Sequence, residues 1–436
     1  FSLDIKRFQK FHSSKKFIME RVTETLGDLY GMHWPYKQHN TSRNQRLLPY
    51  HNELKKAGAC FGVSGEYERP MWYALNNEKP EYKYSFDYQN WYPSVESETK
   101  NTVTNVGLYE LSPFSKYEIR GELAHSELQK ICTANIKDEI GKSTYTQMLN
   151  KAGGIETDLT VICIKKNYFR IISSAAARTH DKAHIIKHLS PELKFEDITD
   201  NLICLGIFGP KSRNLISKIS KDDFTNEIFK FGTGKFINIG LKKIWAQRLS
   251  YVGELGFELY IKKEDSKAVY QSIIAEGKNH NLSHCGSHAM DTMRMESGFL
   301  HWGHDISPEE NQYEAGLNFA ISFKKETNFI GKESLLKIKD NKNNRRFIML
   351  SLKNNNPGYP LLLHEEPIYL NNLIIGKTTS GNYSFNYDKN LSFGYVKSEY
   401  SNEELSKMEL YIEVEKKKYP VNVEVNPLKD KWARFL

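Results

Sequence analysis

The sequence predicts an α+β protein of several domains that ends in an all-β domain. Its 436 residues exceed the ~250–300 residues at which one hydrophobic core stops growing, so two or three domains are expected. Between residues 101 and 337, segments with strand periodicity alternate with segments of helical periodicity. From residue 346 onward the segments are all of strand length and are separated by turns, which favours a small β-barrel or sandwich.

The first 100 residues differ from the rest of the chain. Residues 15–30, KKFIMERVTETLGDLY, carry apolar side chains at helical spacing, and Gly31 follows them, which predicts a helix. Residues 76–100 are rich in Tyr, Pro, Asn and acidic residues. We therefore expect residues 1–100 to be a connecting segment, with a linker or surface loop over 76–100.

The middle of the chain predicts one hairpin and several strand–helix units. Residues 143–150 and 155–166 are two extended runs joined by a turn that contains Gly153 and Gly154, which indicates a β-hairpin. The other predicted strands are 114–121, 167–174, 202–208, 242–251 and 257–263. The other predicted helices are 124–135, 210–219, 267–280 and Ser287 to Ser297.

A polar run, IKDNKNNRR over residues 338–346, marks the expected boundary of the last domain. The strand-length segments beyond it are 346–352, 359–363, 366–370, 373–381, 391–396, 409–415 and 417–425. The predicted domains are therefore 1–100, 101–337 and 346–436.

Composition narrows the class of partner and the compartment. The net charge is +8, but the 61 basic residues are interleaved with 53 acidic ones, whereas a nucleic-acid surface concentrates its charge. A modest positive potential suits an anionic small ligand instead. The five separated cysteines form no CxxC pair, which favours a reducing compartment. No apolar run approaches 18 residues, so we expect no membrane and a cytoplasmic location.

Several motifs of known chemistry are absent, namely GxGxxG after a strand, the Walker loop, GxSxG and HExxH. The one metal-like cluster is HNLSHCGSH over residues 280–288. His residues four apart would share a helical face and suit zinc, but Asn281, Ser283 and Gly286 disfavour a helix there. We predict no metal site.

Two carboxylates stand out by their position. Strand alternation places Asp158 on the face opposite Leu159, just past the Gly-Gly turn. It is either a solvated acid beside the turn or a functional group that lines a cavity, where burial would raise its pKa. Glu254 follows Gly253 at the start of a strand. It is either an ordinary strand-edge acid or an acceptor for a ring that presents two adjacent N–H groups.

A third region combines a helix and an aromatic loop. The helix AMDTMRMESG is expected to be buried and to contain an ion pair between Arg294 and Glu296. Trp302, in the HWGHDI segment that follows, could stack on a flat heteroaromatic ligand or pack in an ordinary core.

Taken together and in order, these segments resemble the glycine-cleavage T-protein (aminomethyltransferase) superfamily from about residue 101 to the end. The segments that carry the resemblance are FSKYEIRG, CTANI, YTQMLNKAGGIETDLTV, IFGPKSRNLI, SYVGELGFELYI, MDTMRMESGFLHWGHDISPEE, YEAGLNFAI, FIGKESL, KTTSGNYS and GYV. Within that superfamily, the sequences of these segments are most similar to the folate half of dimethylglycine and sarcosine dehydrogenases. LYGMHWP and GEYERPMWYA resemble the segment that joins the flavin domain to the folate domain there.

The resemblance implies a fold built around a central folate channel, followed by a C-terminal β-barrel. It implies that the carboxylate of Asp158 is catalytic and that Glu254, Tyr251, Arg294 and Trp302 bind the folate. The implied reaction transfers the methyl-derived carbon of an amine such as dimethylglycine or sarcosine to tetrahydrofolate, which gives 5,10-methylenetetrahydrofolate.

The family dehydrogenases carry a flavin domain upstream, so FAD is expected only on a preceding domain or on a partner flavoprotein. The first residue is Phe1 and not Met, which favours a segment of a longer chain. Two other functions remain open. One is a stand-alone aminomethyl- or methyltransferase, and the other is a non-catalytic folate-binding accessory protein, whose KGCYxGQE signature is absent.

Overall fold

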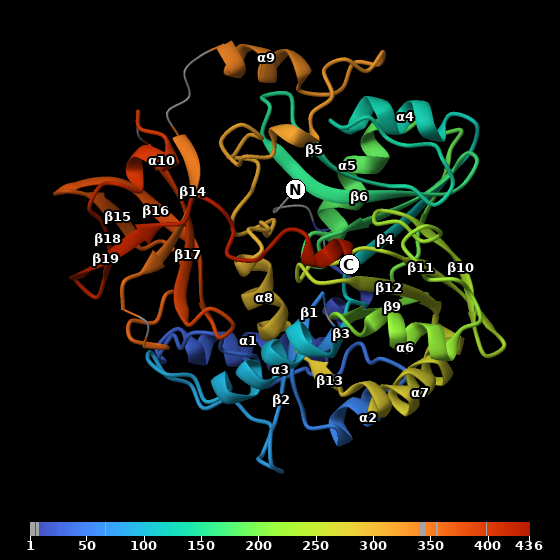
Figure 1. Cartoon of the computed structure of the whole chain (residues 1–436), viewed down its shortest axis with the longest axis horizontal. Helices are drawn as coiled ribbons and strands as arrows, with labels where there is room; N and C mark the ends of the chain where they lie inside the picture. The colour runs from blue at the N-terminus through green and yellow to red at the C-terminus, as the bar shows by residue number, and fades with distance from the viewer. Residues whose placement is uncertain (1–4, 6–7, 66, 341–344, 355, 398) are drawn as a thin grey trace.

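The computed structural model describes residue 5 and residues 8–65, 67–340, 345–354, 356–397 and 399–436 (Figure 1). Two main sheets, one of six strands and one of five, form one part of the molecule together with their helices, and a closed barrel forms the other. The predicted α+β class and the C-terminal β-barrel are both confirmed.

The larger sheet has six strands, and all its pairs are antiparallel except the pair β3 and β13. Its strands, in spatial order, are β10 (Gly234–Ile239), β11 (Lys242–Gln247), β12 (Gly256–Lys262), β9 (Leu202–Phe208), β3 (Val106–Glu110) and β13 (Leu282–Cys285). The second sheet has five strands: β5 (Ser143–Leu149), β6 (Ile155–Lys165), β7 (Tyr168–Ser173), β4 (Ser115–Arg120) and β8 (Lys194–Asp197). A separate hairpin pairs β1 (Ala59–Ser64) with β2 (Tyr67–Tyr73).

The barrel closes with six strands: β14 (Arg345–Leu352), β17 (Lys389–Lys397), β16 (Leu373–Ser384), β15 (Pro367–Leu370), β18 (Leu410–Val414) and β19 (Lys417–Val423). The α-helices are α1 (Lys15–Asp28), α2 (His51–Lys56), α3 (Tyr92–Thr104), α4 (Ala124–Ile131), α5 (Arg178–His188), α6 (Ser212–Ile219), α7 (Ser266–Gly277), α8 (Ser287–Glu296), α9 (Lys332–Asp340) and α10 (Asn402–Leu405). Short 3-10 helices are η2 (Lys10–Ser13), η3 (Lys263–Asp265), η4 (Lys278–His280), η5 (Asn318–Ala320) and η6 (Ala433–Phe435).

The predicted hairpin is confirmed as β5 and β6. Buried and less buried side chains alternate along the first part of β6. Ile155, Thr157 and Leu159 are buried, whereas the intervening Asp158 is half-buried. One face of β6 therefore builds the core while the other presents polar side chains.

The turn of this hairpin is held against a distant loop. A Cβ atom on Gly154 would lie 2.0 Å from the carbonyl oxygen of Pro308, so only glycine allows the loop to approach. Main-chain hydrogen bonding continues this contact, because Ile155 N donates to Glu310 O at 3.0 Å.

Helix α8 lies between the barrel and the rest of the molecule (Figure 1). It contacts β16 and β17 of the barrel on one side and α3 and β2 on the other. From His288 to Glu296 every residue except Asp291 is buried, which agrees with the predicted buried helix.

Two expectations for local structure are wrong. The loop expected over 76–100 contains the first part of α3, which buries Val95 and Glu98. Glu98 looks like a surface acid in the sequence, but it accepts hydrogen bonds from the backbone N–H groups of Tyr73 and Gly286. The strand expected over 359–363 is a turn followed by irregular chain, since Pro360 has no N–H to donate to a ladder.

The boundary run 338–346 lies partly outside the described residues, because 341–344 are not among them. All five cysteines are free and buried. Among the helices within the described ranges, none has both the length and the apolar character needed to cross a membrane.

Candidate active site

Asp158 lies on β6 opposite Gln147 of β5. The hydroxyl group of Tyr145 donates a hydrogen bond to Asp158 Oδ2 at 2.9 Å. Burial raises the pKa of the Asp158 carboxyl to about 6, the Tyr145 hydrogen bond lowers it, and the charge of Asp181 raises it. Tyr145 itself exposes 37% of its surface, so this end of the hairpin borders accessible space. A carboxylate with such a pKa is ionised at neutral pH and can still accept and return a proton.

Tyr251 extends the cluster from a different sheet. It follows β11, its hydroxyl donates to Leu300 O at 2.9 Å, and its ring stacks on Phe299 with centroids 6.0 Å apart. Burial raises its pKa, Arg294 lowers it, and the charge of Asp158 raises it again, so Tyr251 lies within electrostatic reach of both. Asp158 and Tyr251, which the resemblance implies for one site, thus lie within electrostatic range of each other.

Glu254 lies in the loop between β11 and β12 and is 5% exposed. Its Oε1 atom forms an ion pair with Nζ of Lys429, from the segment after β19. Burial raises the pKa of Glu254, and Lys429 opposes that rise. Gly253 has φ +77°, and a Cβ there would lie 2.2 Å from Oγ of Ser297, so glycine lets this loop press against the end of α8.

Arg294 is almost fully buried in α8, and each of its nitrogen atoms donates a hydrogen bond. Nε donates to Asp291 at 2.9 Å, Nη1 to Asp305 at 2.5 Å and to the carbonyl of Phe299, and Nη2 to Ser380 at 2.9 Å. Arg294 therefore ties the loop after α8 to the helix and to barrel strand β16.

The predicted ion pair between Arg294 and Glu296 is wrong. Residues two apart on a helix point in different directions, so the two side chains cannot face each other. Glu296 instead accepts hydrogen bonds from Ser384 and Asn386 of the barrel.

Trp302 lies beside the Asp158 strand. Its Nε1 donates to Ile155 O at 3.2 Å, and its ring stacks on His180 with centroids 5.5 Å apart. His180 in turn lies between Glu156 and Asp181, at 3.1 Å and 3.0 Å from their carboxylate oxygens. The sequence does not reveal the His180–Asp181 pair, because its place beside β6 depends on how α5 packs.

The histidines of the 280–288 cluster have separate neighbours. His284 faces the hydroxyl of Tyr270 at 2.7 Å. His288 bonds the hydroxyl of Tyr82 at 2.9 Å and stacks on Trp91 with centroids 4.0 Å apart. Burial lowers the pKa of both histidines to about 4, so both are neutral core residues.

Comparison with known families agrees with this arrangement. Residues 50–325 match the GCVT N-terminal domain, and residues 345–430 match the glycine cleavage T-protein C-terminal barrel domain. The chain belongs to the glycine cleavage T-protein family. Residues 1–47 match a different family model, the FAD dependent oxidoreductase central domain.

Two individual relatives are named as an oxidase and a dehydrogenase. The chain is 36% identical to 4-methylaminobutanoate oxidase (formaldehyde-forming) of Paenarthrobacter nicotinovorans over 88% of this chain and 46% of that protein. It is 30% identical to mitochondrial dimethylglycine dehydrogenase of Rattus norvegicus over 98% of this chain and 49% of that protein. It thus spans about half the length of these curated relatives.

The crystal structure of glycine cleavage system aminomethyltransferase T from Bartonella henselae has a similar fold. The TM-score is 0.75 at 22% identity, over 88% of this chain and 98% of that one. The predicted family and its T-protein-like fold are therefore confirmed.

Proposed function

We propose that this chain is the one-carbon acceptor part of an enzyme that demethylates an amine such as dimethylglycine or sarcosine. It binds tetrahydrofolate and forms 5,10-methylenetetrahydrofolate. The observation that carries the proposal is the Asp158 carboxylate, with its raised pKa, beside Tyr145 and Tyr251 in a T-protein fold. The similarity to dimethylglycine dehydrogenase over nearly the whole chain supports this choice of reaction.

The chemistry of the side chains fits a folate. A reduced pterin is a flat, polar ring that can stack on aromatic side chains. Aromatic faces are offered by Tyr145, Tyr251 and Phe299, and the ring of Tyr145 is exposed. Among the described residues, Glu254 Oε2 receives no hydrogen bond, which leaves an acceptor on a mostly buried side chain for the N–H groups of a pterin.

The overall reaction joins the iminium carbon to N5 and N10 of the folate, and two protons pass from the folate to the departing amine. Asp158 is the side chain that holds and moves a proton, and Tyr145 fixes its orientation. Arg294 keeps the 299–305 loop in place, and Trp302 closes the side of the hairpin. Enclosure protects the iminium, which hydrolyses quickly in water.

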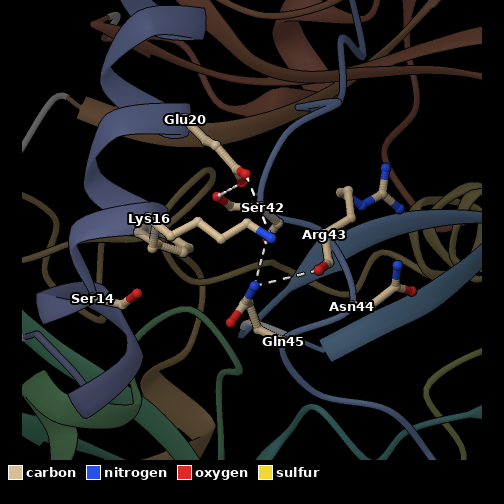
Figure 2. Close-up of a pocket in the computed structure, with 8 residues that line it drawn as sticks. Ser14, Lys16, Glu20, Ser42, Arg43, Asn44 and Gln45 are labelled. Atoms are coloured by element: carbon tan, nitrogen blue, oxygen red, sulfur yellow. Dashed lines mark hydrogen bonds and ion pairs between the residues drawn. The ribbon is translucent and has the colours of Figure 1, made fainter.

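A flavoprotein domain or subunit is the proposed partner, because forming the iminium removes two electrons from the amine. The match of residues 1–47 to an FAD dependent oxidoreductase domain supports it. The same region contains α1, which turns its polar side towards the rest of the chain and its apolar side outward. Ser42 donates a hydrogen bond to Glu20 beside a hollow of about 350 Å³ (Figure 2). Thr41 donates a hydrogen bond to Glu24.

The outward side of α1 is apolar and exposed. Met19, Val22, Leu26 and Leu29 expose between 49% and 60% of their surfaces. A helix normally buries its apolar side, so this face fits the surface of another domain. We place the flavoprotein contact here.

Calorimetric titration with tetrahydrofolate tests the folate proposal. We expect saturable binding that Glu254→Gln weakens by about 1–3 kcal/mol, since the change removes a charged hydrogen-bond acceptor. Glu258→Gln is the matched control, because Glu258 lies four residues further on and bonds Tyr260 instead. No heat from the wild-type protein at high folate would refute folate binding, and binding without carbon transfer would indicate the accessory function.

A further inference from the structure

The ion pair between Glu254 and Lys429 has the hydrogen-bonding pattern of one edge of a pterin. We propose that Lys429 is a specificity residue for the folate: it donates to the 4-oxo oxygen while Glu254 accepts from the 2-amino group and N3–H. This inference rests on the proposed folate function and adds a residue to its site.

Lys429 is held in position and is not a mobile surface lysine. Its side chain is 8% exposed and that of Glu254 is 6% exposed. The segment after β19 leaves the barrel and crosses back to the sheets (Figure 1). The backbone N–H of Lys429 donates to Glu296 O at 3.0 Å. A Cβ on Gly298 would lie 2.8 Å from the ring of Pro427, so this segment also packs closely against the end of α8.

The approach of the two groups depends on Gly253. A Cβ atom at that position would lie 3.1 Å from Cδ of Lys429, tighter than most carbon contacts. With glycine there, the stem of Lys429 passes directly over the loop and its ammonium group reaches Glu254. Tyr251, which is within electrostatic range of Asp158, lies two residues before Gly253 in the same loop.

The pair leaves hydrogen-bonding capacity unused. An ammonium group has three N–H donors, and among the described residues Glu254 is the only acceptor for those of Lys429. Oε2 of Glu254 has no donor within the same residues. A ligand that uses this capacity at two mostly buried side chains gains affinity.

The 2-amino-4-oxo edge of a pterin supplies the missing partners in the right order. It presents two neighbouring donors, the 2-amino group and N3–H, followed by one acceptor, the 4-oxo oxygen. A carboxylate next to an ammonium presents acceptors followed by a donor. Lys429 also favours the ionised form of Glu254, because its charge opposes the effect of burial, which raises the pKa.

A pair of ligands that differ only at this oxygen tests the proposal. Tetrahydrofolate and its reduced 4-amino-4-deoxy analogue are titrated against the wild-type protein and Lys429→Met. We expect the wild type to prefer tetrahydrofolate, and Lys429→Met to lose about 10-fold or more in affinity for it. The analogue should bind the variant as well as or better than the wild type, because its amino group no longer faces an ammonium.

Two further variants separate recognition from folding. Lys429→Gln keeps an N–H donor and should retain part of the preference for the 4-oxo ligand. Lys431→Met is the matched control, because Lys431 lies two residues away and is exposed. Thermal unfolding of each variant shows that it is folded.

The outcomes are distinguishable from failure of the proposed function. If the wild-type protein does not bind tetrahydrofolate, the proposed function fails. If it binds and Glu254→Gln weakens binding, but Lys429→Met weakens both ligands equally, then Lys429 only supports the fold or the charge of Glu254. That result would overturn the specificity role alone.

Discussion

At the scale of single residues, the two site carboxylates are tuned by different neighbours. Asp158 receives one hydrogen bond from Tyr145 and feels the negative charge of Asp181, and burial dominates its pKa. Glu254 has a cation at contact distance in Lys429. The first arrangement suits a proton acceptor, and the second suits a fixed charge that binds a ligand.

Asp158→Asn should lower carbon transfer about 100–10,000-fold, because it removes the proton acceptor, while tetrahydrofolate binding changes little. The reverse reaction measures the rate: 5,10-methylenetetrahydrofolate and sarcosine give tetrahydrofolate and the iminium, which water then hydrolyses to formaldehyde and sarcosine. Asp158 accepts a proton when carbon passes to the folate, so it donates one in the reverse direction, and the wild-type rate of this reverse reaction should fall as pH rises through its pKa of about 6. A wild-type profile that is flat between pH 5 and 7 would contradict this role.

The sequence identified Asp158 because it lies just past the Gly-Gly turn of a predicted hairpin, and Glu254 because it follows Gly253 near a predicted strand. It could not identify their partners, because those depend on contacts that span the fold. Lys429 is 175 residues from Glu254 in the chain. Tyr145 is close to Asp158 in sequence, but only the register of the hairpin places its hydroxyl on the carboxylate.

At the scale of elements, strand-length segments between turns predicted most strands, and polar composition misled. Strand β6 shows the expected period-two burial over its first residues, whereas barrel strand β17 is buried without alternation from Asn390 to Val396. Helix α3 was missed because Glu98 satisfies backbone donors inside the protein, and no local pattern distinguishes such an acid from a solvated one. Helix α1 was predicted, but the outward orientation of its apolar side depends on the 37–45 segment that bonds its polar side.

The exposed face of α1 yields a prediction at this scale. Met19→Glu combined with Leu26→Glu should change the free energy of unfolding by no more than about 0.5 kcal/mol, because both side chains are exposed. When the chain is fused behind the half of the Paenarthrobacter nicotinovorans oxidase that it does not match, the same changes should speed proteolysis at the junction. Leu373→Glu with Ile374→Glu, on the exposed start of β16, is the control. Equal proteolysis of both pairs would argue against docking through α1.

At the scale of the whole molecule, one network joins the barrel to the sheets. Asp305 is fully buried and accepts hydrogen bonds from Arg294, Thr379 and Ser380, so α8, the following loop and β16 meet at one carboxylate. The geometry of this network depends on how two domains dock. The sequence therefore indicated that Arg294 forms an ion pair, but it assigned Glu296 as the partner in place of Asp305.

Arg294→Met should destabilise the protein by about 3–5 kcal/mol, because it leaves the buried charge of Asp305 without its cation. Since the network crosses between domains, urea unfolding should change from one transition towards two as the barrel separates first. Lys377 lies on β16, like Ser380, and forms an exposed ion pair with Glu365. Its replacement, Lys377→Met, should leave the urea unfolding curve nearly unchanged. A single transition with an unshifted midpoint in Arg294→Met would rule out this coupling.

The parallel pairing of β13 with β3 has a consequence for synthesis on the ribosome. Strand β3 ends at Glu110, but its outer neighbour begins only at Leu282. Until that residue has left the exit tunnel, the nascent chain carries a strand with one unsatisfied edge, which is a template for pairing with other chains. Helix α8 begins at Ser287, directly after β13, so the step that covers this edge also delivers Arg294. Protection of this edge and delivery of Arg294 therefore occur at nearly the same moment of translation.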